Sequence, residues 1–141
     1  MFATILLPVD LADEETAAPA IHKAVELAQA SEGSLRLIHV RSVTPVAYMD
    51  FVPPVFDDEQ QGAAETRLAA LAAGVDLPPE RVSAVVRLGS VYGEVLDEAE
   101  RTGADLIVVG SHRPSMATFL LGSNAGAIVR HAKCSVLVVR D

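Results

Sequence analysis

Five short apolar runs recur along the chain, and each has the length of a β-strand. Several of them, such as LIVV and VLVV, lack the alternation of polar and apolar residues that a half-exposed strand shows, which indicates that both faces of the strand are buried. This pattern predicts a parallel sheet with helices on each side. The predicted strands cover residues 2–9, 34–40, 81–88, 105–109 and 135–140.

Amphipathic helical patterns lie between these runs. The predicted helices cover residues 17–30, 60–73 and 91–101, and a last one begins near Ser123 or Asn124 and continues to about His131. In the first three, apolar residues recur at spacings of three and four, with polar residues at the other positions. Ser90 is placed to cap the third helix, and Gly74 and Gly103 stand where helices end.

Strands and helices alternate along the whole chain, and right-handed crossovers then give a parallel sheet rather than hairpins. We therefore predict an α/β fold with three layers and a doubly wound sheet. The length of 141 residues matches one independent domain covering residues 1–141. The stretch 41–59 holds three prolines and has no clear period. It is either a functional loop or a surface connection that contacts a partner.

Charge and hydropathy exclude several classes of partner. The formal net charge is −8, and the only lysines are Lys23 and Lys133, so no basic patch is available for nucleic acid or an anionic membrane surface. No apolar run approaches the roughly 20 residues of a membrane span, and the first residues carry no basic start of a signal peptide. We expect a cytoplasmic protein with no membrane insertion. The single cysteine, Cys134, is expected to pack beside the last strand.

The most distinctive candidate site lies on the connection after the fourth strand. In an open parallel sheet, ligands bind outside the carboxyl ends of the strands. Gly110 follows a buried strand, and its missing Cβ would let a ligand approach the backbone. Gly122 and Ser123 open the last helix, whose free amides attract anions, and Asn124 adds a donor. Together they predict a phosphate site, although each alone also fits a plain turn or helix cap.

Asp10 ends the first strand and faces the same predicted crevice. Its carboxylate is suited to accept a hydrogen bond from a ribose hydroxyl or an adenine amine. Alternatively, it caps the first helix or forms a turn with Asp13. Of the four histidines, His39 is expected to pack at a strand end, and His112 belongs to the phosphate loop, where it contacts a ligand or caps a turn.

Several enzyme and switch classes do not fit. The chain lacks the phosphate-loop motif G-x-x-x-x-G-K-[ST], and no glycine follows the first strand as a dinucleotide fold requires. A receiver domain needs an aspartate at the end of the third strand, where Arg87 and Leu88 stand. The histidines have no metal-ligand spacing, and no nucleophile, base and orienting acid can be assembled. We do not expect a dedicated enzyme.

At these residues the chain resembles the universal stress protein family, and most closely its F/G-type branch of small bacterial proteins. The resemblance extends over nearly the whole length. It is carried by I-L-L-P-V-D at 5–10, L-I-V-V-G-S-H-R-P at 106–114, L-L-G-S-N-A at 120–125 and V-R-H-A-K-C-S-V-L-V-V-R at 129–140. It implies the Rossmann-like, adenine nucleotide alpha hydrolase-like fold, with a five-stranded parallel sheet of order 3-2-1-4-5.

The ATP-binding members of this family carry the pattern G-x2-G-x9-G-[ST], from which this chain departs. Arg113 replaces the second glycine, and the following interval is one residue shorter. A guanidinium there is able to donate several hydrogen bonds to phosphate oxygens, or it is simply exposed to solvent. The complete predicted site comprises Pro8, Val9, Asp10, Val40, Val109, Gly110, His112, Arg113, Gly122, Ser123 and Asn124.

By resemblance, Pro8 and Val40 line the adenine, Val109 flanks it, and Asp10 holds the ribose or base. The residues that surround the phosphates are then Gly110, Arg113, Gly122, Ser123 and Asn124. The implied ligand is ATP, with or without Mg²⁺. The implied role is a nucleotide-dependent regulatory switch with at most slow ATP hydrolysis. It acts as a homodimer or tetramer paired through the edge strand at 136–139. Two alternatives are a nucleotide-free dimeric scaffold and an adenine-nucleotide hydrolase-like enzyme.

Overall fold

A computed structural model describes residues 2–41, 56–111 and 122–140. Its centre is a five-stranded parallel sheet in the order β3-β2-β1-β4-β5, which confirms the predicted topology. The change of strand order beside β1 places a crevice at the carboxyl ends of β1 and β4. The strands are β1 (Thr4–Pro8), β2 (Ser34–Arg41), β3 (Val82–Leu88), β4 (Leu106–Gly110) and β5 (Ser135–Val139).

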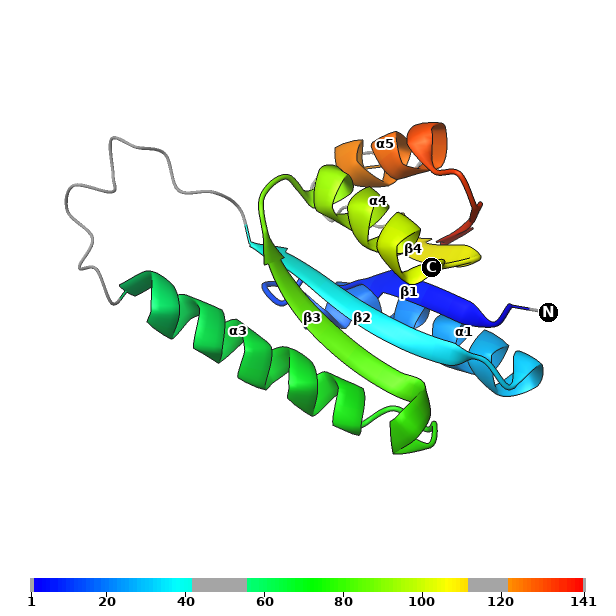
Figure 1. The fold of residues 1–141 in the computed structure, drawn as a ribbon, viewed down its shortest axis with the longest axis horizontal. Coiled ribbons are helices and arrows are strands. Elements are labelled where there is room, and N and C mark those ends of the chain that lie inside the picture. The colour runs from blue at the N-terminus through cyan, green and yellow to red at the C-terminus, as the bar shows by residue number, and fades with distance from the viewer. Residues whose placement is uncertain (1, 42–55, 112–121, 141) are drawn as a thin grey trace.

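Helices cover both faces of the sheet, as predicted. Helices α1 and α3 pack on one face, and α4 and α5 pack on the other (Figure 1). None of the helices in the described ranges is both long enough and apolar enough to cross a membrane. The helices are α1 (Glu14–Ser31), α3 (Phe56–Ala73), α4 (Val91–Thr102) and α5 (Ser123–His131), with a short 3₁₀ turn η1 at Pro79–Arg81.

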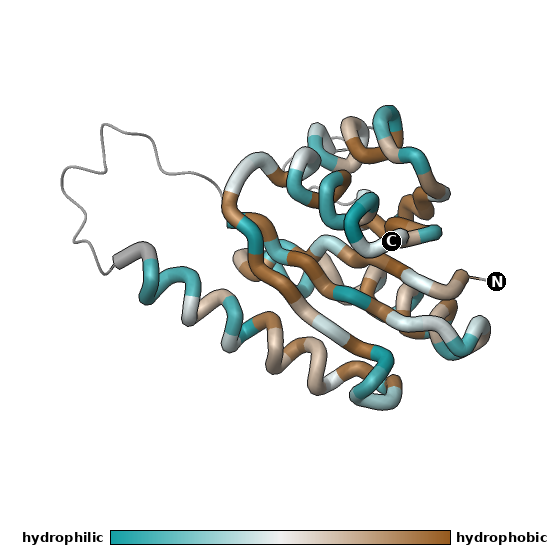
Figure 2. Tube along the Cα trace, viewed as in Figure 1, coloured by the Kyte–Doolittle hydropathy of each residue, from teal (hydrophilic) through white to brown (hydrophobic). Residues whose placement is uncertain are grey.

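The central strands are apolar along most of their length because both of their faces are covered (Figure 2). Side chains 5–7 of β1 and 106–109 of β4 are all buried. They divide between two apolar clusters, one under α1 and α3 and the other under α4 and α5. This arrangement confirms the prediction of burial on both faces for β1 and β4. For the run at 136–139 the prediction is wrong, since these residues are only half-buried because β5 lies at the edge of the sheet.

The helix boundaries differ from the predicted ones mainly at the starts. Helix α1 begins at Glu14 rather than at residue 17, because Asp13 caps it with its side chain. Helix α3 begins at Phe56 rather than at residue 60. Ser90 occupies the N-cap position of α4 but its side chain makes no cap hydrogen bond. Gly103 ends α4 with φ 68°, a left-handed conformation that glycine adopts without strain, as its position predicts.

A buried carboxylate fixes α4 on the sheet. Glu98 is 1% exposed, and its carboxylate accepts hydrogen bonds from Arg36 Nε at 2.6 Å and from Arg87 Nε at 3.2 Å. Arg101 pairs with the same carboxylate. Burial, followed by the charge of Arg87, lowers the pKa of Arg36. These ion pairs connect β2, β3 and α4, and so they help to place Val91 at the crevice.

Cys134 is half-buried against the cluster under α4 and α5, which confirms its expected packing role. Burial raises the pKa of its thiol above the ordinary value.

Candidate functional site

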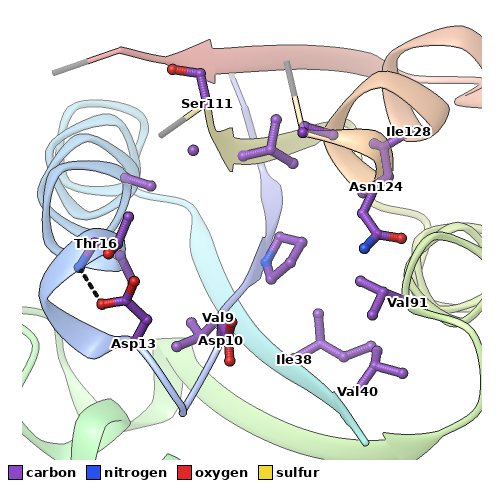
Figure 3. Close-up of a pocket in the computed structure, with 17 residues that line it drawn as sticks. Val9, Asp10, Asp13, Thr16, Ile38, Val40, Val91, Ser111, Asn124 and Ile128 are labelled. Atoms are coloured by element: carbon purple, nitrogen blue, oxygen red, sulfur yellow. Dashed lines mark hydrogen bonds between the residues drawn. The ribbon is translucent and has the colours of Figure 1, made fainter. Parts of the chain in front are cut away.

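A cleft of about 460 Å³ opens at the carboxyl ends of β1 and β4, between the first turns of α1 and α5 (Figure 3). Apolar side chains form most of its floor, and polar groups stand on both sides. The described lining residues are Pro8, Val9, Asp10, Asp13, Thr16, Ala17, Ala20, Ile38, Val40, Val91, Val109, Gly110, Ser111, Gly122, Asn124, Ala125 and Ile128.

Most of the residues singled out from the sequence meet in this cleft. The structure brings together Pro8, Val9, Asp10, Val40, Val109, Gly110, Gly122 and Asn124. Ser123 is exposed and does not line the cleft, although it is the first residue of α5. His112 and Arg113 lie outside the described residues. The predicted closeness of Asp10 to the start of the last helix is therefore present in the structure.

Asp10 is exposed and belongs to a tight turn that links β1 to α1. Its Oδ1 accepts a hydrogen bond from the Ala12 amide at 2.9 Å, and its carbonyl accepts one from the Asp13 amide at 3.1 Å. The turn with Asp13 considered from the sequence is therefore formed. The helix cap is made by Asp13, whose Oδ1 accepts from the Thr16 amide at 3.4 Å (Figure 3).

Gly110 gives the cleft its depth at the end of β4. Among the described residues, a Cβ built on this glycine would meet only the Ala20 Cβ, at 4.0 Å. No side chain of the described ranges therefore fills the space beside this backbone. A ligand is able to contact the strand end directly there, as the position of the glycine predicts.

On the opposite side, α5 begins without a side-chain cap. Gly122 is buried at its N-cap position, with φ −59° and ψ 155°, and among the residues that the structure describes no side-chain hydrogen bond caps this helix start. Asn124 is half-buried, and its amide points into the cleft (Figure 3). The first amides of a helix have no partner within it and carry the positive end of its dipole, so this side of the cleft favours an anion.

Sequence reasoning missed several lining residues. Val91 and Ile128 belong to the apolar stripes of α4 and α5, where the helical spacing alone explains them as core. Thr16 belongs to no distinguishing motif, and Ser111 lies in the family-like run at 106–114 without a predicted role. The sequence predicts Asp13 only as a turn partner of Asp10. An aspartate just before an amphipathic helical stretch is also a typical N-cap, and Asp13 has that role in the structure.

The charges in the described part of the lining are both negative. They belong to Asp10 and Asp13, and no lysine or arginine is among the described lining residues. Within the described ranges, no group of three or more His, Cys, Asp or Glu is placed to hold a metal ion. The chemistry of the described lining therefore combines an apolar floor, one carboxylate turn and one positively polarised helix start.

The sequence matches the universal stress protein family over residues 1–140. It is 41% identical to universal stress protein G of Escherichia coli O157:H7, with 99% of this chain and 100% of that protein covered. The structure resembles universal stress protein UspA from Lactobacillus plantarum, with a TM-score of 0.72, 25% identity and coverage of 98% and 97%.

Two further solved structures contain nucleotides. One is a universal stress protein in complex with cAMP, with a TM-score of 0.62, 22% identity and coverage of 98% and 97%. The other is the universal stress protein from Archaeoglobus fulgidus in complex with dAMP, with a TM-score of 0.63, 17% identity and 97% coverage of each chain. At these identities the likeness concerns the fold.

Proposed function

This chain belongs to the universal stress protein family, and from that premise we propose that it is an ATP-binding regulatory protein of the stress response. The observation that carries the proposal is the cleft itself. It places the Asp10 turn and the uncapped start of α5 on two sides of one space of about 460 Å³, which suits a nucleotide.

The lining divides into parts that match the parts of an adenine nucleotide. Pro8, Val9, Val40 and Val109 offer apolar contacts to the base, and the Asp10 carboxylate accepts from the ribose hydroxyls. Gly110, Gly122 and the α5 amides, including that of Ser123, surround the phosphates, with Asn124 as a side-chain donor. His112 and Arg113 complete the phosphate side in this proposal, as the sequence predicts.

The nucleotides seen in the two related structures, cAMP and dAMP, support an adenine ligand. The triphosphate and Mg²⁺ are the finer part of the proposal. A divalent cation bound to the phosphates would reduce their repulsion by Asp10 and Asp13, so we expect ATP to bind more tightly with Mg²⁺ than without it.

Nucleotide binding then acts as a switch rather than as a step of fast catalysis. The described lining offers no nucleophile activated by a base, so we propose at most slow ATP hydrolysis. We place the protein in the cytoplasm. A hydrolase-like enzyme would instead turn over many equivalents of a nucleotide substrate, which a product assay distinguishes from binding.

Assembly is the second part of the proposed switch. Strand β5 lies at the edge of the sheet, and its residues 136–139 are apolar and only half-buried. Such an edge is stabilised by pairing with a second copy, so we propose a homodimer or tetramer formed through β5. Sedimentation with and without ATP measures the assembly size and its dependence on nucleotide.

Isothermal titration calorimetry with ATP, with and without Mg²⁺, tests the function directly. We expect saturable binding of one nucleotide per chain. In a separate thermal unfolding experiment, ATP at 100 times its Kd should raise the free energy of unfolding by about 2.7 kcal/mol. GTP serves as the matched control for the base. A flat titration with a normally folded protein contradicts the proposal and favours the nucleotide-free dimeric scaffold.

A further inference from the structure

Side chains of two other elements make hydrogen bonds to the backbone of the turn that carries Asp10. Arg67 Nη2, on α3, donates to the Leu11 carbonyl at 2.5 Å. His39 Nδ1, on β2, lies 2.9 Å from the Val9 carbonyl and 3.4 Å from the Leu11 amide. Because the shorter contact is to a carbonyl, we assign the proton to Nδ1. The turn is therefore attached to α3 and β2 as well as to β1.

Of these two side chains, only that of Arg67 comes from outside the sheet. A hydrogen bond from a guanidinium is charge-assisted and stronger than a neutral one. Arg67 also lies 3.5 Å from the Glu14 carboxylate, but both side chains are about half exposed, so this ion pair contributes little. The hydrogen bond to the Leu11 carbonyl is thus the polar connection between α3 and the Asp10 turn, beside the burial of the Leu11 side chain in the cluster that holds Ala64 and Leu68.

Helix α3 is held to the sheet by few buried side chains. Among its residues 58–73, Ala64 and Leu68 are buried and Leu71 and Ala72 are partly buried against the same cluster, whereas most other positions are exposed. An element with little buried apolar surface opens or shifts at low free-energy cost. The position of α3 is therefore the adjustable part of the arrangement behind Asp10.

We propose that Arg67 is a positioning residue for the nucleotide site, through which the docking of α3 sets the placement of Asp10. The proposal rests on the proposed function. It makes α3 the element that responds to an occupied cleft. Because coupling between two equilibria is reciprocal, a ligand held by Asp10 also strengthens the docking of α3.

Calorimetry on Arg67→Gln with adenosine, AMP and ATP tests this role. The variant should weaken all three ligands by the same factor, about tenfold, since it acts through Asp10 on the nucleoside part. Glu14→Gln is the matched control, because it removes the ion pair and leaves the Arg67 bond to Leu11. We expect it to change each affinity by less than about twofold.

A double variant shows whether Arg67 acts through Asp10. If it does, Arg67→Gln should cause no further loss of adenosine affinity in a chain that already carries Asp10→Ala. Amide hydrogen exchange on the native chain gives a second measurement that does not depend on the variants. Adenosine should raise the protection of α3 amides, and unchanged protection would overturn the proposal.

The outcomes separate the two levels of inference. A native chain that binds none of the three compounds removes the proposed function, and the positioning role with it. Native binding that is unaffected by Arg67→Gln removes the positioning role alone. A loss confined to ATP also overturns it, because that result describes a long-range charge attraction to the phosphates rather than placement of Asp10.

Discussion

Two helices begin at the same cleft, and they differ in the groups that face the free amides of their first turns. The start of α1 is capped by the Asp13 side chain and followed by Glu14 and Glu15 in the first turn. The start of α5 has no side-chain cap and no acidic residue in its first turn. Both helix starts carry a positive dipole end, but only that of α1 is compensated by its own carboxylates. The phosphates of a ligand therefore belong beside α5.

The largest predicted effect comes from filling the space that both helix starts share. Gly110→Val would project a branched side chain beyond the end of β4, where Ala20 at 4.0 Å is the one contact of a Cβ within the described ranges. The strand accommodates valine, but the ligand loses its close approach. We expect ATP affinity to fall by at least about 100-fold, or about 2.7 kcal/mol, in calorimetry.

The control for this variant is its own unfolding midpoint, measured without ligand. It should stay near that of the native protein, because the added atoms enter an open cleft. Native ATP affinity in a folded Gly110→Val protein would mean that the nucleotide lies elsewhere, and the comparison of the two helix starts would lose its meaning.

The next effect isolates a backbone amide of α5. Ser123→Pro removes the first amide of the helix while keeping its start intact, because proline is favoured at this position. The preceding Gly122, with φ −59° and ψ 155°, already has the conformation that proline demands of its neighbour. We expect ATP affinity to fall about tenfold, since a hydrogen bond to a charged group is lost, and adenosine affinity to stay unchanged.

Ser123→Ala is the matched control, because it removes the hydroxyl and keeps the amide. Its affinity for ATP should lie close to the native value, given that the Ser123 side chain is exposed and outside the cleft lining. Equal losses in both variants would assign the effect to the hydroxyl and would contradict a role for the open helix start.

The third prediction concerns the capped helix start. Asp13→Asn keeps a capping oxygen for the Thr16 amide but removes one negative charge from the cleft. We expect stability to change little, since asparagine and aspartate cap equally well. ATP affinity measured without Mg²⁺ should rise about threefold, because a repulsive charge at the rim is gone.

Asp13→Ala separates the cap from the charge. It should lower the free energy of unfolding by about 1 kcal/mol, as the loss of a cap does, while ATP gains as much affinity as with asparagine. Weaker ATP binding in both variants would mean that Asp13 contacts the ligand favourably.

The fold could be predicted from the sequence because a strand that is buried on both faces has an unbroken run of apolar residues. Unbroken apolar runs such as 106–109 and the alternation with amphipathic helices specify the parallel layers, and the family resemblance supplied the strand order, which the structure confirms. Helix starts were less predictable. The caps depend on side-chain geometry. The predicted start of α1 at residue 17 is therefore three residues beyond the observed Glu14, and Ser90 does not make the predicted cap hydrogen bond.

The site was predictable where backbone chemistry marks it. Glycines at 110 and 122 and a carboxylate at the end of β1 are visible in the sequence, and the structure brings them to one cleft. Part of the apolar floor, Pro8, Val40 and Val109, is predicted through the family resemblance, whereas Ile38 and Val91 look like any core residue until the sheet is assembled. Nor does any local pattern connect Arg67 with Leu11, since their contact joins α3 to a turn far away in the sequence.

The smallest effect on binding is expected at Gly126, within α5. A Cβ there would meet no described atom within 4 Å, and Gly126 is not among the described lining residues of the cleft. Gly126→Ala should therefore raise the free energy of unfolding by about 0.5–1 kcal/mol through helix propensity alone. ATP affinity should change by less than about twofold, because the amides of α5 are already arranged in a helix before ligand binds. Calorimetry and urea unfolding on the same sample measure both quantities. A rise in affinity as large as the gain in stability would show that the helix start forms only with the ligand, and α5 would then differ from α1 in order as well as in charge.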